Sequence, residues 1–296
     1  MKDSLAIAVL AGLGGMVGWG AADFLAKKTI DRIGDLATLF WAQVIGVIPL
    51  LLIFGFTRNI PTLHAWDPLW LLLLGVVSAL SYLSLYAGFG KGQVSFLSPV
   101  FASHAALVVA VSALIFHEHI TTNQWLAIGI VIFGVVAIST DPKDLGRILR
   151  TRQRSETAGL TQVLSAGVAY ALWLVMLDRF MGGRDWVFFL LVIRVGAAAT
   201  LYCYARVTHR SLALTAEQRQ LSGYLTAIGV FDVAAFGAVS WGFSATTHTS
   251  VVAVLASAFS VPTLFLARWF LNERLVRAQQ VAAGIILTGI ALVAVT

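Results

Sequence analysis

Long apolar runs follow one another along almost the whole chain, and this feature most restricts how the chain can fold. Each run is about 20 residues long, the length that an α-helix needs to cross the hydrocarbon core of a bilayer. Hydrophobic residues make up 59% of the 296 residues and charged residues only 11%, whereas soluble domains carry roughly 25% charged residues. No soluble core could cover so much apolar surface, so the sequence predicts a multi-pass integral protein of the cell membrane.

The runs predict helices rather than a transmembrane barrel. They are continuously apolar instead of alternating, and a helix satisfies its own backbone hydrogen bonds inside lipid. Ten runs lie between charged or turn-rich breaks, at residues 5–25, 36–57, 68–88, 95–116, 122–139, 159–178, 186–206, 221–241, 249–271 and 278–295. The first is too long for the apolar part of a signal peptide, so we expect it to remain as a helix. The predicted fold class is all-α, with ten transmembrane helices.

The second half of the sequence repeats the first. A shift of 155 residues places Glu118 on Glu273, Gln124 on Gln279, Gly129 on Gly284 and Gly134 on Gly289. Because each half holds five runs, the second half must enter the membrane from the opposite side. The sequence therefore predicts two inverted five-helix repeats, an arrangement found in many secondary transporters. The first repeat spans residues 1–140, a polar linker spans 141–158, and the second repeat spans 159–296.

The order of several short motifs resembles the drug/metabolite transporter superfamily, in particular its EamA-type ten-helix members. The motifs are Trp19-Gly20 with Phe24 in the first run, Gly75 through Tyr86-Ala87 in the third, and the segment from Ser95 to Glu118. Glu118 and Glu273 each lie just after a run and before a polar turn, and the corresponding helices in that family typically end in a glutamate. Pro99 also fits the family, but its repeat position is Val254 and the second half has Pro262 instead. Helix breaks at equivalent positions are therefore not predicted.

Two ionisable side chains fall at membrane depth, where charges are costly and usually functional. Arg194 lies about eight residues into the seventh run, and Asp232 lies at a similar depth in the eighth, so the two are expected to form a buried ion pair. Their repeat counterparts are Gln43 and Ser78. In one interpretation Asp232 binds a proton or a substrate amine and Arg194 modulates its charge. In the other, the pair only braces the fold.

Two further polar residues have alternative interpretations. His104 lies near the middle of the fourth run, and imidazole is the side chain that titrates near neutral pH. It is a candidate for the substrate path, against the alternative of a hydrogen-bonded packing residue. Asp23 precedes Lys27 by four residues at the end of the first run, and this spacing predicts an ion pair at the membrane interface.

Aromatic residues and glycines supply the other candidates. Trp19, Trp241, Tyr82 and Tyr86 could line a cavity, although tryptophan and tyrosine also gather at membrane interfaces. Tyr82 and Tyr86 are four residues apart and therefore share a helix face. The many glycines of the first run, with Gly88, Gly90, Gly129 and Gly284, are expected to permit close helix packing.

Catalytic and cofactor motifs are missing from the sequence. It contains no paired-histidine metal motif, no GxSxG elbow and no phosphate-binding loop. The cluster of His117, Glu118 and His119 superficially resembles a metal site, but adjacent residues of a helix do not share a face. The net charge of +6 is spread between the apolar runs, which argues against nucleic-acid binding. We expect a non-enzyme with no cofactor and no metal.

The distribution of basic residues bears on the orientation in the membrane. Most Lys and Arg side chains, among them Lys27, Arg32, Lys91 and Arg210, follow the odd-numbered runs. The positive-inside rule then places both termini outside, whereas EamA-type proteins commonly have both termini in the cytoplasm.

The leading functional prediction is a secondary transporter, an exporter or exchanger of small metabolites such as amino acids or related amphipathic solutes. Coupling to H+ through Asp232 or His104 is one option for its energy source. The protein would work in the lipid bilayer as a monomer or homodimer. The alternatives are a flippase for lipid-linked intermediates and a membrane scaffold that transports nothing.

Overall fold

The computed structural model describes residues 2–116, 122–139, 158–181, 186–245, 249–273 and 277–295. All regular secondary structure in these ranges is helical. The helices are α1 (Lys2–Ile33), α2 (Asp35–Thr57), α3 (Asp67–Phe89), α4 (Val94–Ala102), α5 (His104–Phe116), α6 (Thr122–Ser139), α7 (Leu160–Met181), α8 (Trp186–Val207), the short 3₁₀ helix η1 (Gln218–Leu221), α9 (Ser222–Ala245), α10 (Thr249–Ser257), α11 (Ser260–Phe270) and α12 (Arg277–Val295). The predicted all-α class is confirmed.

Six described helical segments are long and apolar enough to cross a membrane. They are Leu5–Ile33, Asp35–Thr57, Asp67–Phe89, Leu160–Leu177, Trp186–Val207 and Gln218–Gly242. Shorter apolar helices occupy the remaining runs, and four of them, α4 with α5 and α10 with α11, result from two breaks. The polar linker and the cluster of His117, Glu118 and His119 lie outside the described residues, except for Ala158 at the end of the linker.

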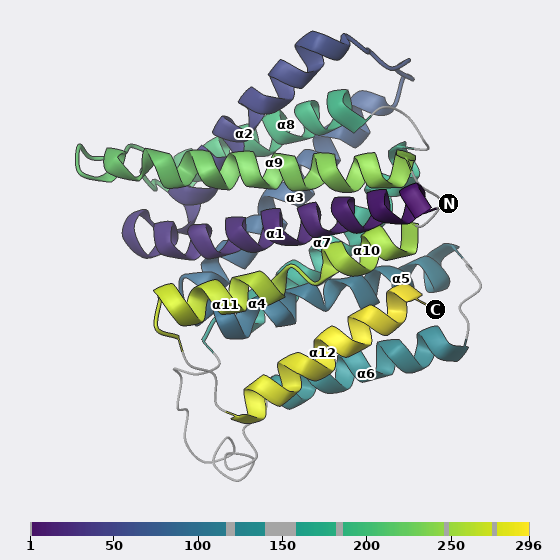
Figure 1. Ribbon diagram of the computed structural model, residues 1–296. Helices are drawn as coiled ribbons and strands as arrows, with labels where there is room; N and C mark the ends of the chain where they lie inside the picture. The colour runs from purple at the N-terminus through teal and green to yellow at the C-terminus, as the bar shows by residue number, and fades with distance from the viewer. Residues whose placement is uncertain are drawn as a thin grey trace.

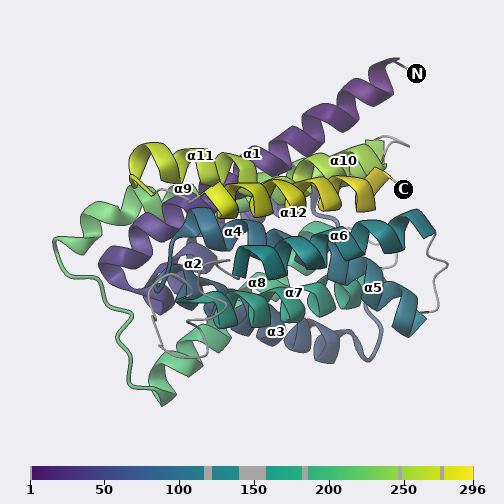
Figure 2. The same cartoon turned by 90° about the horizontal axis from the view of Figure 1, so that it is seen from below.

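The helices of the two halves of the chain pack against each other instead of forming separate bodies. Helix α1 contacts α9, α10 and α11, and α2 contacts α8 and α9. Figure 1 shows α1 between α9 and α10, with both chain termini at the same end of the bundle. In Figure 2, α6 and α12 lie side by side near the surface. A cavity inside this bundle is therefore lined by residues from both halves.

The breaks in the fourth and ninth runs lie at equivalent positions of the two halves. Ser103 separates α4 from α5, and Ala258, which is 155 residues further on, lies between α10 and α11. In the second half, Pro262 has no N–H for the Ala258 carbonyl, which instead accepts a bond from the Val261 N–H at 2.9 Å. The sequence did not predict equivalent breaks, because the prolines of the two halves differ in position; different local bonds interrupt the two helices at the same level.

In the first half the break is stabilised by two side chains. The hydroxyl of Ser103 donates to the Val100 carbonyl at 2.6 Å. Nδ1 of His104 donates to the Phe101 carbonyl at 2.8 Å. Backbone carbonyls released from a helix inside a membrane must find new donors, and these two bonds provide them.

Glycines allow some of the helices to approach closely. A Cβ on Gly18 of α1 would lie 2.9 Å from the Phe231 carbonyl oxygen of α9, which agrees with the predicted packing role. The same prediction for Gly129 and Gly284 is wrong, because no atom from another described helix lies within 4 Å of a Cβ built on either. The α6–α12 contact uses Gly134 instead, where a Cβ would lie 3.0 Å from a backbone nitrogen of α12.

One carboxylate joins the two halves of the chain at the start of α4. Glu273, just after α11, accepts hydrogen bonds from the Ser95 N–H at 2.9 Å, the Ser95 hydroxyl at 2.7 Å and the Val94 N–H at 3.3 Å. The first N–H groups of a helix have no partner within it, and an anion is favoured near them. Glu273 therefore caps α4 from the other half of the chain.

We expect Glu273→Ala to lower the free energy of unfolding by about 1–3 kcal/mol, because donors at the start of α4 would lose a charged acceptor. Thermal unfolding of the purified protein in detergent measures the effect. Glu217→Ala is the control, since Glu217 precedes η1 without a side-chain capping bond, and it should change the stability by less than about 0.5 kcal/mol. Equal melting temperatures for the two variants would contradict the capping role.

Candidate functional site

A cavity of about 420 Å³ lies inside the bundle. Its walls come from α1, α2 and α3, from both sides of each helix break, and from α7, α8 and α9. Phe101 and His104 line it beside the first break, and Ser257 and Phe259 line it beside the second. Its volume lies within the range of about 300–1,000 Å³ typical of small-molecule sites.

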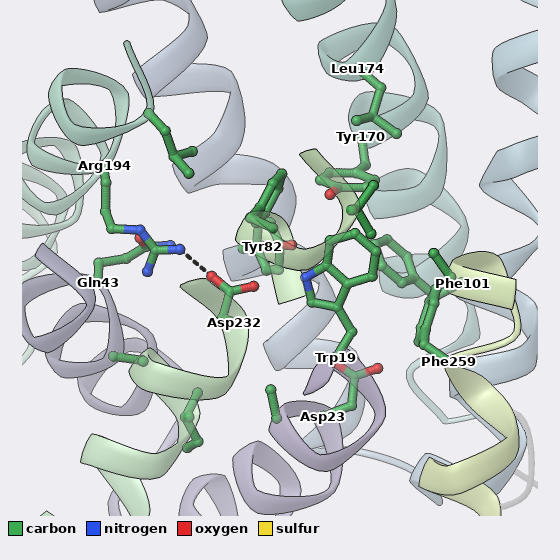
Figure 3. Close-up of a pocket in the computed structure, with 18 of the residues that line it drawn as sticks. Trp19, Asp23, Gln43, Tyr82, Phe101, Tyr170, Leu174, Arg194, Asp232 and Phe259 are labelled. Atoms are coloured by element: carbon green, nitrogen blue, oxygen red, sulfur yellow. Dashed lines mark hydrogen bonds and ion pairs between the residues drawn. The ribbon is translucent and has the colours of Figure 1, made fainter. Parts of the chain in front are cut away.

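Arg194 of α8 and Asp232 of α9 form the predicted ion pair on the cavity wall. The side chains are 5% and 18% exposed, and Figure 3 shows the guanidinium turned toward the carboxylate. Each residue lies near the middle of its helix. Separating two such charges would leave each one unpaired away from water, so the pair links α8 to α9, which otherwise both pack against α2.

Residues of the first half complete the polar side of this region. Gln43, the repeat counterpart of Arg194, lies beside it in Figure 3 and lines the cavity. Gln43, Ser78, Arg194 and Asp232 also line one adjoining small recess. The pair is thus in the same recess as its two repeat counterparts.

The two predicted tyrosines belong to an aromatic wall. Tyr82 and Tyr86 both line the cavity, with ring centroids 6.4 Å apart. The ring of Tyr170, from α7, lies 5.4 Å from that of Tyr82 and an equal distance from Phe101. Tyr170 was missed in the sequence because nothing in its own run indicates a partner on α3.

The position of His104 is compatible with both of the roles that the sequence left as alternatives. It lines the cavity, and its Nδ1–H is used by the helix break. Its ring lies 4.8 Å from that of Tyr170, edge to face. Because a carbonyl can only accept, Nδ1 carries the proton of the neutral imidazole.

The two predicted tryptophans have different positions. Trp19 of α1 lines the cavity and packs edge to face against Phe236 at 5.2 Å. Its indole Nε1 is fully enclosed and has no hydrogen-bond partner among the residues that the structure describes. Trp241 is not among the residues that line the cavity, and it is 48% exposed.

Asp23 is the main cavity residue that the sequence analysis misassigned. The predicted ion pair with Lys27 is wrong, because Lys27 bonds to Asp31 and to the Phe89 carbonyl, each at 2.8 Å. Asp23 is 9% exposed, lines the cavity and accepts a bond from the Ser98 hydroxyl at 3.2 Å. Helix α1 continues to Ile33, so Asp23 lies well inside it. The i, i+4 spacing from Trp19 was the available signal.

Among the residues that the structure describes, no group of three or more His, Cys, Asp or Glu side chains could hold a metal ion. The single cysteine, Cys203, is exposed on α8. The polar and aromatic groups on the cavity wall are carboxylates, a guanidinium, an imidazole, an amide, hydroxyls and aromatic rings.

Comparison with known proteins identifies the family. The family model described as the EamA-like transporter family matches residues 6–140 and again residues 157–295. The chain belongs to the EamA-like transporter family. Membership makes this a multi-pass membrane transporter of the drug/metabolite kind, as the motifs had suggested.

Two other matches of this EamA-like transporter are informative. An uncharacterized protein of Methanocaldococcus jannaschii is 26% identical over 132 residues, which are 45% of this chain and 96% of that protein. One solved crystal structure aligns with 96% of this chain and 95% of its own, with a TM-score of 0.64 and 14% identity. At that identity, the structural likeness supports the fold alone.

The ion pair leads to a prediction about stability. We expect Asp232→Asn to lower the free energy of unfolding by about 3–5 kcal/mol, because Arg194 would remain buried without a counter-charge. Thermal unfolding in detergent measures this loss.

The control for that variant is Asp35→Asn, which breaks the ion pair of Asp35 with Arg210. Arg210 is 41% exposed, so water can hydrate it and the loss should stay below about 1 kcal/mol. Similar losses of unfolding free energy in the two variants would mean that the Arg194–Asp232 pair stabilises the protein no more than an exposed ion pair does.

Proposed function

We propose that this protein is a secondary transporter that binds a small amphipathic metabolite in the cavity and moves it across the cell membrane by export or exchange. The observation that carries the proposal is the position of the cavity, near the middle of α1, α8 and α9 and between the two halves of the chain. Binding sites near the bilayer midplane between internal repeats are typical of secondary transporters.

The proposed membrane topology has ten crossings in two inverted repeats, residues 1–140 and 159–296. Two matches to one family model support it, as does a relative that is nearly covered by half of this chain. In this topology the α4–α5 and α10–α11 segments are each one crossing with a break. Broken helices beside the site are also a common feature of transporters, because their ends can face a solute.

The helix breaks and the ion pair suggest how the site could be exposed alternately to the two sides. The segments that meet at the breaks come from opposite halves, since α4 contacts α11 and α10 contacts α1. Rocking of one half against the other would open first one end of the cavity and then the other, while the Arg194–Asp232 pair keeps α8 and α9 together. The energy would come from solute or ion gradients, with H+ as one coupling ion to test.

A membrane scaffold that transports nothing would need the apolar bundle but not a cavity of this size with ionisable walls.

A transport assay tests the proposed function. Amino acids, amines, nucleosides and sugars are first screened for a rise in the melting temperature of the purified full-length protein. The compound that gives the largest shift is then followed in proteoliposomes, with and without a pH gradient.

We expect Ser240→Phe to reduce that transport at least tenfold, because Ser240 lines the cavity and a phenyl ring would fill part of it. Ala234→Phe is the matched control, since Ala234 lies on the same helix but its side chain is exposed on the outer surface. It should keep near-normal transport. No transport by the unmodified protein, or equal loss in both variants, would contradict the proposal.

A further inference from the structure

The charges of the cavity do not balance. The cavity lining contains two carboxylates, Asp23 and Asp232, and one guanidinium, Arg194, which leaves a formal charge of −1 with His104 counted as neutral. Arg194 is paired with Asp232. Among the described residues, Asp23 has no basic partner, and its one hydrogen bond comes from Ser98. A nearly buried carboxylate without a counter-charge is costly, and a cation beside it would remove that cost.

Aromatic rings surround the space next to this carboxylate. Trp19 lies one helical turn before Asp23 on α1, and Figure 3 shows Asp23 beside the indole. The Phe259 ring centroid is 6.5 Å from that of Trp19 and 6.2 Å from that of Phe101. Aromatic faces attract ammonium groups, most strongly where water is excluded. They also provide apolar surface for the body of a solute.

A second, independent feature of the same cavity indicates a ligand. The enclosed Trp19 N–H has no acceptor among the described residues, and Figure 3 shows its nitrogen edge facing Asp232 across the cavity. Buried donors are nearly always bonded. The N–H is covered by protein in this structure, so the acceptor of a solute reaches it only if the indole turns when the ammonium group binds Asp23.

We infer that the solute is an organic monocation with an aromatic or similarly apolar body and a neutral hydrogen-bond acceptor. Its ammonium group binds Asp23, its apolar part lies among Trp19, Phe101 and Phe259, and its acceptor receives the Trp19 N–H. An anionic solute is disfavoured because Asp232 already occupies Arg194. This inference rests on the proposed solute-binding cavity and specifies the substrate class.

Ligands that differ in charge but not in shape test the inference without changing the protein. We use 2-phenylethylammonium, 2-phenylethanol and phenylacetate as cationic, neutral and anionic probes, and phenylalaninamide as a cation with a carbonyl acceptor. Calorimetry on the purified full-length protein should show binding of 2-phenylethylammonium at least tenfold tighter than that of the neutral and anionic probes. Phenylalaninamide should bind tighter still. Equal affinities, or a preference for phenylacetate, would overturn the inference.

Asp23→Asn then tests the residue. It keeps the size of the side chain and an oxygen for the Ser98 hydroxyl, and we expect it to weaken binding of 2-phenylethylammonium at least tenfold while binding of 2-phenylethanol stays the same. Asp35→Asn, which removes a carboxylate outside the cavity, should leave both affinities unchanged. Unchanged cation binding in Asp23→Asn would overturn the role of Asp23.

Failure of this inference can be told apart from failure of the transport proposal. If the cation binds as expected but does not cross proteoliposome membranes, transport by this cavity is contradicted and the charge preference stands. If a neutral or anionic solute is transported and Ser240→Phe blocks it, transport stands and the cation preference is wrong.

Discussion

The ion pair between Arg194 and Asp232 is the constraint on which the rest of the site depends. Both charges lie near mid-helix in segments apolar enough to cross a membrane, so neither can remain alone there without a large cost. The packing around the pair reflects this. A side chain on Gly46 of α2 would occupy the place of the Arg194 guanidinium, and a Cβ on Gly229 of α9 would lie 2.9 Å from the Ala42 carbonyl of α2. Glycines thus let α2 and α9 close around the pair.

The cavity exists because this polar region and the two helix breaks lie next to each other. At each break the chain leaves regular helix geometry, and the rings of Phe101 and Phe259 face the space beside it. The hydrogen bonds of Ser103 and His104 make the first break possible in lipid. His104 is therefore a residue of the cavity wall and also a part of the backbone support.

Much of the fold could be predicted from the sequence, because bilayer thickness fixes the length and apolar character of a spanning helix. The Arg194–Asp232 pair could be found by counting depth along two neighbouring antiparallel runs. Asp23 was misassigned because a lysine-rich segment, taken as the end of the first helix, is the last two turns of a longer one. The depth of a residue in the membrane cannot be counted correctly from a helix end that is itself assigned incorrectly.

Other features of the site were not predictable from single runs. Tyr170 and Phe259 reach the cavity through contacts between distant helices, and the sequence contains no periodic signal for such contacts. The equivalent level of the two breaks was hidden because Pro99 precedes its break by four residues while Pro262 follows its own by four. Trp19 and Trp241 are the same residue type, and the sequence alone could not show that Trp19 lines the cavity while Trp241, at the end of the eighth run, is 48% exposed and lies outside the lining.

The central claim is that a solute occupies the cavity between the two halves. It is tested most directly by protection from chemical labelling. Ser240→Cys, in a chain where the exposed Cys203 is replaced by serine, is treated with a membrane-impermeant thiol reagent in proteoliposomes. With saturating 2-phenylethylammonium, this account predicts that labelling of the cysteine at the cavity wall slows at least several-fold, while an Ala234→Cys chain reacts as before. Equal labelling of the Ser240→Cys chain with and without the compound would contradict it.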